Sequence, residues 1–167
     1  NQFGGHIQRL QGDGVFVLFE RRNKPHFNSI VNALNSASLI TQFISVDLAE
    51  IFTKNEIRPL RIRVGIDYGD ERDVVWSYYG LLGCDELTTT SLHTDMAAKL
   101  QAKAFDNKIL IGNNIVTNLD LTREYISNYY NKENNREEVY QITPTLTYKF
   151  YVFEWITYLS KHPNFKL

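Results

Sequence analysis

The sequence predicts a single α+β domain in which helices pack on a mainly antiparallel sheet. Short segments with alternating apolar residues, typical of strands, are interspersed with two longer segments whose apolar residues recur every three or four positions, as in helices. A chain of 167 residues can bury one sizeable core and is short for two. We therefore expect one domain over residues 1–160 and a tail over residues 161–167.

The first strand pair is expected over residues 6–20, around the turn Gly12-Asp13-Gly14. Glycine accepts the positive φ values of tight turns, which places Asp13 at the tip. The mostly apolar run after the turn predicts a strand that is covered on both faces. A long helix with one buried apolar stripe is expected over residues 25–54, with proline in its first turn.

The rest of the chain continues to alternate between strands and helices, and this order is typical of a sheet covered by helices. In chain order we expect a strand over 60–68, a returning strand over 74–79, a loop or helix entry over 87–92, a helix over 92–104, a strand over 108–111, a helical turn over 113–118, a loop over 128–138, and a closing hairpin of 139–142 with 148–155.

The composition excludes several classes of protein. The formal net charge is −1, so no global basic field attracts nucleic acid or an acidic membrane, and no aromatic RNA-binding signature is present. No apolar run approaches the roughly 18–20 residues of a bilayer span, and the start of the chain is polar, unlike a signal peptide. A single cysteine, Cys84, fits a reducing compartment, so we expect a cytoplasmic protein.

Asp13 has two interpretations. Asp beside Gly is among the commonest turn signals, so the residue can be purely structural. A carboxylate at a glycine-flanked tip is also accessible to Mg²⁺ or Mn²⁺, hard ions that bridge protein carboxylates to substrate phosphates. Two-metal phosphoryl chemistry needs a second carboxylate nearby, which this motif does not supply.

Asp95 and Lys99 lie four residues apart, on the helix face away from the apolar stripe. They could form an exposed ion pair worth about 0.2–0.5 kcal/mol. Alternatively, Asp95 could bind a sugar hydroxyl while Lys99 neutralises charge that develops on a phosphate. Arg9 could read acceptor oxygens of a base or phosphate, and Tyr79 could wall a pocket, although such residues in strands are more often solvated or packed.

No role is predicted for the histidines, because their positions show no metal-ligand spacing. They are His6, His26, His93 and His162.

Four segments, taken in order, resemble the class III nucleotide cyclases. Residues 5–19 resemble the metal-binding hairpin of that family, and residues 61–69 are similar to its central strand. Residues 95–100 (Asp-Met-Ala-Ala-Lys-Leu) are similar to its helix motif Asn-x-Ala-x-Arg-Leu. Residues 108–111 match the strand that follows. The resemblance therefore covers about residues 3–117.

The departures from the family pattern favour a pyrimidine substrate. Asp95 and Lys99 stand where the family has a ribose-binding Asn and a phosphate-binding Arg. Arg9 stands where purine cyclases have a base-reading Lys, and Gly80 falls near their base-reading Asp or Thr. Residues 76–95 resemble the pyrimidine cyclases of bacterial Pycsar antiphage systems, which make cyclic UMP or cyclic CMP to activate a separate effector. The resemblance implies conversion of UTP to cyclic UMP, with CTP as the alternative.

The resemblance also implies an architecture. Family members have a ferredoxin-like fold and pair head to tail as homodimers, with two Mn²⁺ or Mg²⁺ ions in each composite site. The 3′-oxygen of the ribose attacks the α-phosphorus and expels pyrophosphate. The implied roles are metal binding for Asp13, catalysis for Asp13 and Lys99, and substrate binding for Arg9, Gly12, Gly14, Asp95 and Tyr79.

One expected metal ligand is not in the chain. The family's first metal Asp lies on a strand upstream of the hairpin, before Asn1, and the absence of an initiator Met suggests that this strand and its helices are missing. Three alternatives stay open: a catalytically inactive cyclase-like regulatory domain, a ferredoxin-like binding module without a nucleotide role, and a purine cyclase.

Overall fold

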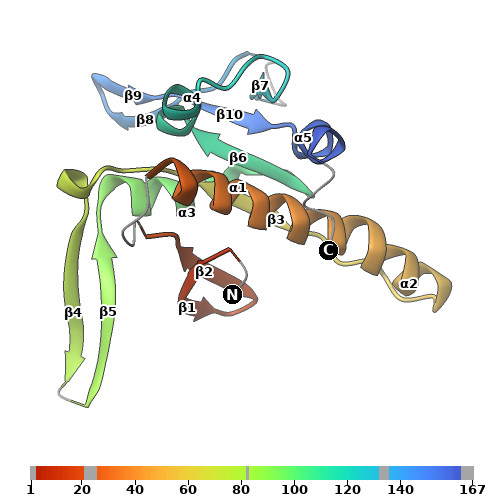
Figure 1. The fold of residues 1–167 in the computed structure, drawn as a ribbon, viewed down its shortest axis with the longest axis horizontal. Coiled ribbons are helices and arrows are strands. Elements are labelled where there is room, and N and C mark those ends of the chain that lie inside the picture. Colours follow the sequence, from red (N-terminus) through yellow and green to blue (C-terminus); the bar gives the residue numbers. More distant parts are fainter. Residues whose placement is uncertain (1–2, 21–25, 82, 132–135, 163–167) are drawn as a thin grey trace.

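The computed structural model describes residues 3–20, 26–81, 83–131 and 136–162. Its centre is a four-stranded sheet of order β3-β6-β10-β7 (Figure 1). The strands are β3 (Arg63–Ile66), β6 (Lys108–Gly112), β10 (Phe150–Phe153) and β7 (Ile126–Asn128). β3 runs parallel to β6, whereas β10 is antiparallel to both β6 and β7. The predicted α+β class is confirmed.

Strand β6 is buried on both faces, because two different helices cover the sheet. Its side chains alternate between two clusters: Ile109 and Ile111 pack with residues of α1 (His26–Gln42), and Leu110 packs with residues of α3 (Leu92–Lys103). Successive side chains of a strand point to opposite faces, so the two helices lie on opposite sides of the sheet.

The long N-terminal helix is confirmed. Helix α1 continues through a π-helical segment, Phe43–Leu48, into α2 (Ala49–Lys54). The expected buried stripe holds for Leu34, which is 1% exposed, but not for Ile51, which is 54% exposed. The stripe ends because α2 extends past the edge of the sheet, as Figure 1 shows.

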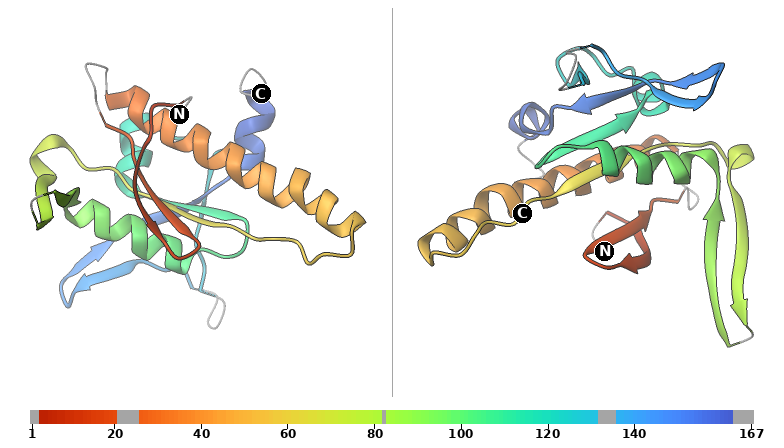
Figure 2. Two further views of the ribbon diagram at one scale, coloured as in Figure 1. Left: turned by 90° about the horizontal axis from the view of Figure 1, so that it is seen from below. Right: turned by 180° about the vertical axis from the view of Figure 1, so that it is seen from behind.

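Two hairpins extend from the body on the side away from β10 (Figures 1 and 2). They are β1 (His6–Gln11) with β2 (Gly14–Leu18), and β4 (Val75–Leu81) with β5 (Cys84–Thr90). The β1–β2 hairpin was expected. The prediction that its second strand is covered on both faces is wrong, because Val15 of β2 is 51% exposed.

The pairing of β4 also differs from the expectation. It pairs with β5 rather than returning along β3. The segment expected as a loop or helix entry, residues 87–92, is divided between β5 and the beginning of helix α3. Threonine is β-branched and favours strands, so the run Thr88-Thr89-Thr90 fits an extended conformation as well as a loop.

The C-terminal part contains two further corrections. Strand β8 (Tyr140–Thr143) pairs with β9 (Leu146–Tyr148), and β10 leaves this hairpin to enter the central sheet. The predicted closing hairpin is therefore wrong, because one alternating run is divided between two strands. The segment after β10 forms helix α5 (Trp155–Lys161), which buries Trp155 and Tyr158; no helix was expected there.

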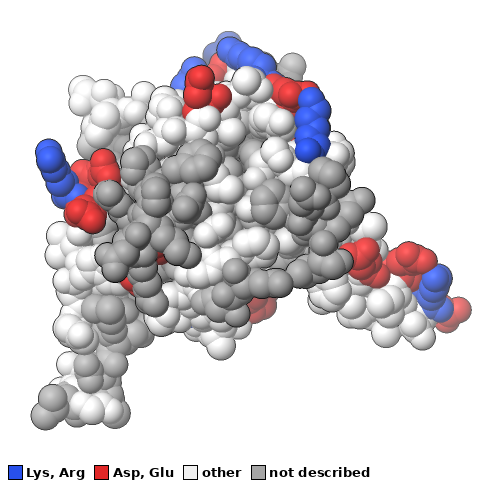
Figure 3. Space-filling model, in the orientation of Figure 1, with Lys and Arg blue, Asp and Glu red and all other residues white. Residues whose placement is uncertain are grey.

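The remaining helical elements are short. The predicted helical turn is α4 (Asn113–Leu119), and a 3₁₀ turn spans Glu71–Asp73. No helix among the described residues is long and apolar enough to cross a bilayer. On the face in Figure 3, the described charged residues form small groups of mixed sign rather than one basic field.

Candidate active site

The Gly12-Asp13-Gly14 tip forms as predicted. Gln11 and Gly14 are paired across the hairpin, which leaves Gly12 and Asp13 as a two-residue loop. Gly12 has φ +60°, the left-handed value that the first residue of a type II′ turn requires. Gly14 is an ordinary first residue of β2, and no positive φ is needed there. Asp13 is exposed, so its carboxylate is accessible to a ligand.

Helix α3 presents Asp95 and Lys99 to solvent, as the spacing predicted. Met96 and Leu100, on the opposite side of the helix, are fully buried. No ion pair joins Asp95 to Lys99, both of which are described; instead, Lys99 Nζ lies 5.3 Å from the centroid of the Tyr140 ring. Exposed carboxylate and ammonium groups on one helix face can both bind a polar ligand.

Arg9 and Tyr79 lie on the two projecting hairpins. Arg9 is exposed on β1 opposite Phe16, and Tyr79 is 72% exposed on β4. The hairpins are joined where Gln8 Nε2 donates to Thr88 Oγ1 at 2.7 Å. No hydrogen bond or ion pair among the described residues links Asp13 to Tyr79 or to the α3 residues. The predicted site residues therefore lie on separate elements: the β1–β2 hairpin, strand β4 and helix α3.

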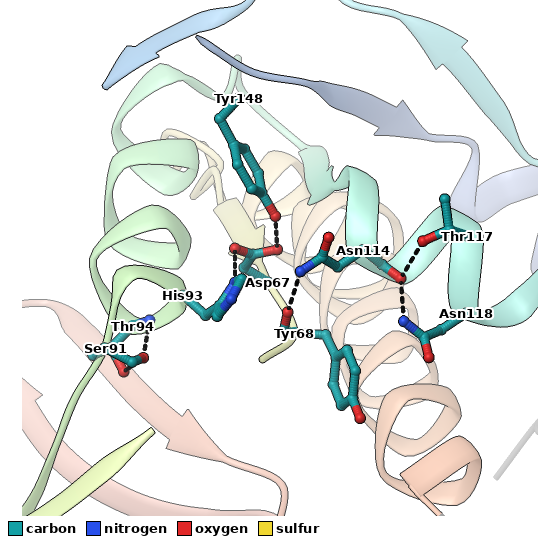
Figure 4. Close-up of polar contacts among 9 residues, drawn as sticks. All are labelled: Asp67, Tyr68, Ser91, His93, Thr94, Asn114, Thr117, Asn118 and Tyr148. Atoms are coloured by element: carbon teal, nitrogen blue, oxygen red, sulfur yellow. Dashed lines mark hydrogen bonds and ion pairs between the residues drawn. The ribbon is translucent and has the colours of Figure 1, made fainter. Parts of the chain in front are cut away.

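The structure reveals a buried polar cluster that the sequence did not indicate. Asp67, which directly follows β3, has a side chain with 0% exposure. The hydroxyl of Tyr148 donates to Asp67 Oδ1 at 2.6 Å, and His93 Nδ1 lies 2.9 Å from Asp67 Oδ2 (Figure 4). The cluster ties β9 and the first turn of α3 to the end of β3. A buried carboxylate is tolerated when such partners satisfy it.

The electrostatics follow from this geometry. The hydrogen bond with Asp67 raises the pKa of His93 against the opposing effect of burial, and the charges of Asp67 and Asp73 raise it further. Burial raises the pKa of Tyr148, and the adjacent Asp67 charge adds to the effect. Tyr148 is therefore a permanent hydrogen-bond donor, and the Asp67–His93 contact becomes an ion pair when the ring is protonated.

Neighbouring residues leave space for this cluster and fix the backbone around it. A Cβ on residue 69 would come within 2.3 Å of the His93 ring, so glycine is needed there. Ser91 caps α3, since its hydroxyl accepts from the Thr94 N–H at 3.0 Å, and this fixes the turn that carries His93. Asn114 Nδ2 donates to the Tyr68 carbonyl at 3.0 Å and holds the chain just after Asp67.

Sequence reasoning assigned no role to His93, and the structure corrects this. A polar residue directly after an apolar strand, between Gly65 and Gly69, was the one local signal at Asp67. Tyr148 lies 81 residues further along the chain, and no periodicity connects the two. The side chain of Cys84 lies outside the described residues.

The described residues do not by themselves form a metal site. Carboxylate oxygen is the donor that Mg²⁺ and Mn²⁺ prefer, and Asp13 offers it in an accessible place. No group of three or more potential ligands occurs within the described parts of the chain. Asp67 is already bound to His93 and Tyr148. A complete site needs ligands in addition to those that the described residues bring together.

Comparison with known proteins identifies relatives along nearly the whole chain. The chain is 41% identical over 162 residues to a cytidylate cyclase of Staphylococcus aureus. The alignment covers 95% of this chain and 38% of the relative. A cytidylate cyclase of Escherichia coli is 34% identical over 179 residues, covering 98% of this chain and 37% of the relative. The chain thus spans less than half the length of these relatives. No protein-family model matches it.

Solved structures share the fold. The adenylyl cyclase CyaB of P. aeruginosa superposes with a TM-score of 0.70 at 18% identity, covering 91% of this chain and 72% of that one. The guanylyl cyclase Cya2 superposes with a TM-score of 0.67 at 14% identity, covering 91% and 71%. The 41% identity with a cytidylate cyclase over 95% of this chain, together with the shared fold, identifies the chain as a member of the class III nucleotide cyclases that is related to the pyrimidine cyclases.

Proposed function

We propose that this chain is the catalytic domain of a pyrimidine nucleotide cyclase whose substrate is CTP. The observation that carries the proposal is the 41% identity, over 95% of the chain, with a protein named cytidylate cyclase. UTP is the substrate expected from the sequence resemblance alone. The same name on further relatives, from another organism, favours CTP and leaves UTP as the second candidate.

The exposed face of α3 supports this reaction. In the proposed complex, the Asp95 carboxylate accepts a hydrogen bond from a ribose hydroxyl, and the Lys99 ammonium neutralises charge on the phosphates as the 3′-oxygen attacks and pyrophosphate leaves. Lysine acts as a compact point charge, whereas arginine offers a planar fork of donors, so Lys99 would tolerate several phosphate orientations.

Asp13 would contribute one ligand to a divalent cation. When bound, Mn²⁺ or Mg²⁺ lowers the pKa of a coordinated hydroxyl and neutralises phosphate charge. The exposed position of Asp13 at the end of a hairpin suits a site shared with other ligands.

A second copy of the chain is proposed to complete each site. Both projecting hairpins expose large apolar side chains, among them Leu10 at 75% and Leu81 at 81%. A two-stranded hairpin alone is marginally stable in water, and exposed apolar patches mark interaction surfaces. In such a homodimer, Asp13 of one protomer and Lys99 of the other would serve the same site.

The test is direct. Full-length protein is incubated separately with CTP, UTP, ATP and GTP in the presence of Mn²⁺, and the products are identified by mass. We expect cyclic CMP and pyrophosphate from CTP. Cyclic UMP alone would move the assignment to UTP, and turnover of purine nucleotides alone would contradict a pyrimidine cyclase. No product from any nucleotide would favour the inactive regulatory domain.

We further propose that the cyclic nucleotide is a second messenger in antiphage defence and activates a separate effector, as the resemblance to the Pycsar cyclases implies. Bacteria that carry the complete gene and its neighbours should form fewer phage plaques than bacteria carrying the Asp13→Ala gene. Equal plaque numbers would contradict this role.

A further inference from the structure

The hairpin of β8 and β9 contacts helix α3 at two places. Tyr140 and Tyr148 are paired directly across this hairpin, and both pack against the buried cluster that contains Met96 and Leu100 of α3. Residues directly opposite in an antiparallel pair project to the same face, so the two rings form one surface toward the helix.

The first contact holds the beginning of α3. The Tyr148 hydroxyl donates to Asp67 at 2.6 Å, and Asp67 in turn bonds His93 at 2.9 Å. His93 is the second residue of the helix. The rings of His93 and Tyr148 also meet edge to face, with centroids 6.5 Å apart. Figure 4 shows the three side chains converging from β3, α3 and β9.

The second contact holds the middle of α3. Lys99 Nζ lies 5.3 Å from the centroid of the Tyr140 ring, within the range of a cation–π interaction. Lys99 is six residues after His93, which corresponds to about 9 Å along the helix axis. The paired tyrosines therefore contact α3 at two positions along the helix, near His93 and near Lys99. The contact with the Tyr140 ring also restricts the long side chain of Lys99.

The face of α3 that carries Asp95 stays exposed to solvent. Asp95 follows His93 by two residues, which places their side chains about 200° apart around the helix. His93 points toward the sheet, with a side chain that is 11% exposed, whereas Asp95 is exposed. The contact through His93 can thus fix the start of the helix without occupying Asp95, whereas Tyr140 contacts the Lys99 side chain itself and orients it.

We propose that Tyr140 and Tyr148 are positioning residues, which hold Asp95 and Lys99 of α3 in place for the nucleotide. This inference rests on the proposed function, which assigns Asp95 and Lys99 to the ribose and the phosphates. Neither tyrosine needs to touch the substrate. Small displacements of reacting groups lower turnover strongly, so loss of either contact should reduce kcat more than it raises KM.

The experiment compares Tyr140→Leu and Tyr140→Phe in the full-length protein, with the exposed residue Tyr130 changed to Leu as a matched control. Tyr140→Leu removes the ring beneath the Lys99 ammonium and should lower kcat for CTP about tenfold or more. Tyr140→Phe keeps the ring and should restore kcat to within about threefold of wild type. Tyr148→Phe removes the hydroxyl alone and should lower kcat at unchanged secondary structure.

A second readout separates this inference from the proposed function. Amide hydrogen exchange over residues 95–99 should accelerate in Tyr140→Leu and in Tyr148→Phe, and not in the Tyr130→Leu control. If wild-type protein converts no nucleotide, the proposed function fails and exchange still tests how α3 is held. Unchanged exchange in both variants, or kcat equal to wild type in fully folded Tyr140→Leu protein, would overturn the positioning role.

Discussion

Gly112 lies so close to Asp67 that a Cβ on residue 112 would come within 1.9 Å of the Oδ1 atom. The same Cβ would lie 2.6 Å from the hydroxyl of Tyr148. The missing side chain at the end of β6 is therefore what allows the carboxylate and the phenol to meet above the strand.

Gly112→Ala should destabilise the domain. The added methyl group overlaps Asp67 in a region with no open space, and overpacking of this kind costs about 1–3 kcal/mol. Urea unfolding monitored by circular dichroism measures the change. Asn118→Ala, at an exposed position of α4, is the control and should stay within about 0.5–1 kcal/mol. Equal midpoints for Gly112→Ala and wild type would contradict the contact.

Gly65→Ala should displace α3 from the sheet. A Cβ at this position of β3 would come within 2.2 Å of the Ala97 carbonyl oxygen and 2.3 Å of the Gln101 nitrogen. Both are backbone atoms, so the helix must shift rather than a side chain rotate. We expect lower stability together with a loss of cyclase turnover of at least about tenfold, measured on protein that is still folded. Normal turnover would show that the close packing is not needed.

The Asp67–His93 contact should make stability depend on pH. The pKa of His93 is raised in the folded state, so its contribution is fully present below the unfolded pKa of about 6.5. It is then lost as the pH rises through the higher folded pKa. The unfolding free energy of wild type minus that of His93→Asn should therefore decrease from about pH 6.5 upward.

His6→Asn, on the exposed strand β1, is the control for this measurement, because the same change of residue there removes no contact with Asp67. If the unfolding free energies of wild type and His93→Asn differ by the same amount across the pH range, no proton is taken up at His93 on folding.

Asp13 and Lys99 should complement each other between protomers. Asp13→Ala should abolish activity almost completely, and Lys99→Ala should lower kcat about 100-fold or more. If the sites are shared, mixing the two inactive variants should restore about a quarter of the wild-type rate, because half of the random dimers contain one intact site of two. Mixtures that stay inactive while forming dimers would contradict the composite site.

The orientation of α3 can be tested by two substitutions on one helix. Leu100→Ala removes a side chain with 0% exposure and should destabilise the domain by about 2–5 kcal/mol. Leu92→Ala, at a position that is 41% exposed, should destabilise it by less than about 1 kcal/mol. Thermal and urea unfolding of both variants measure the difference. Similar losses would mean that the helix is rotated from the orientation that exposes Asp95 and Lys99.

Local patterns were sufficient for much of the fold. The long helix through α1 and α2, helix α3, strand β6 and the first hairpin all appear where residue spacing predicted them. The pairing of strands was harder to predict, because the alternating pattern of a strand does not reveal which other strand it pairs with. For that reason β4 was expected to return along β3, and residues 139–155 were expected to form one hairpin.

The sequence by itself determined the presentation of single residues: Asp13 at a turn, and Asp95 and Lys99 on the face of α3 opposite Met96 and Leu100. Turn chemistry and helical period are local properties, so about 20 residues of context suffice for them. Only the tertiary structure decided that Asp67, His93 and Tyr148 meet, since their contact depends on strand order and on the space left at Gly112. Contacts across 81 residues follow from packing, which no local pattern encodes.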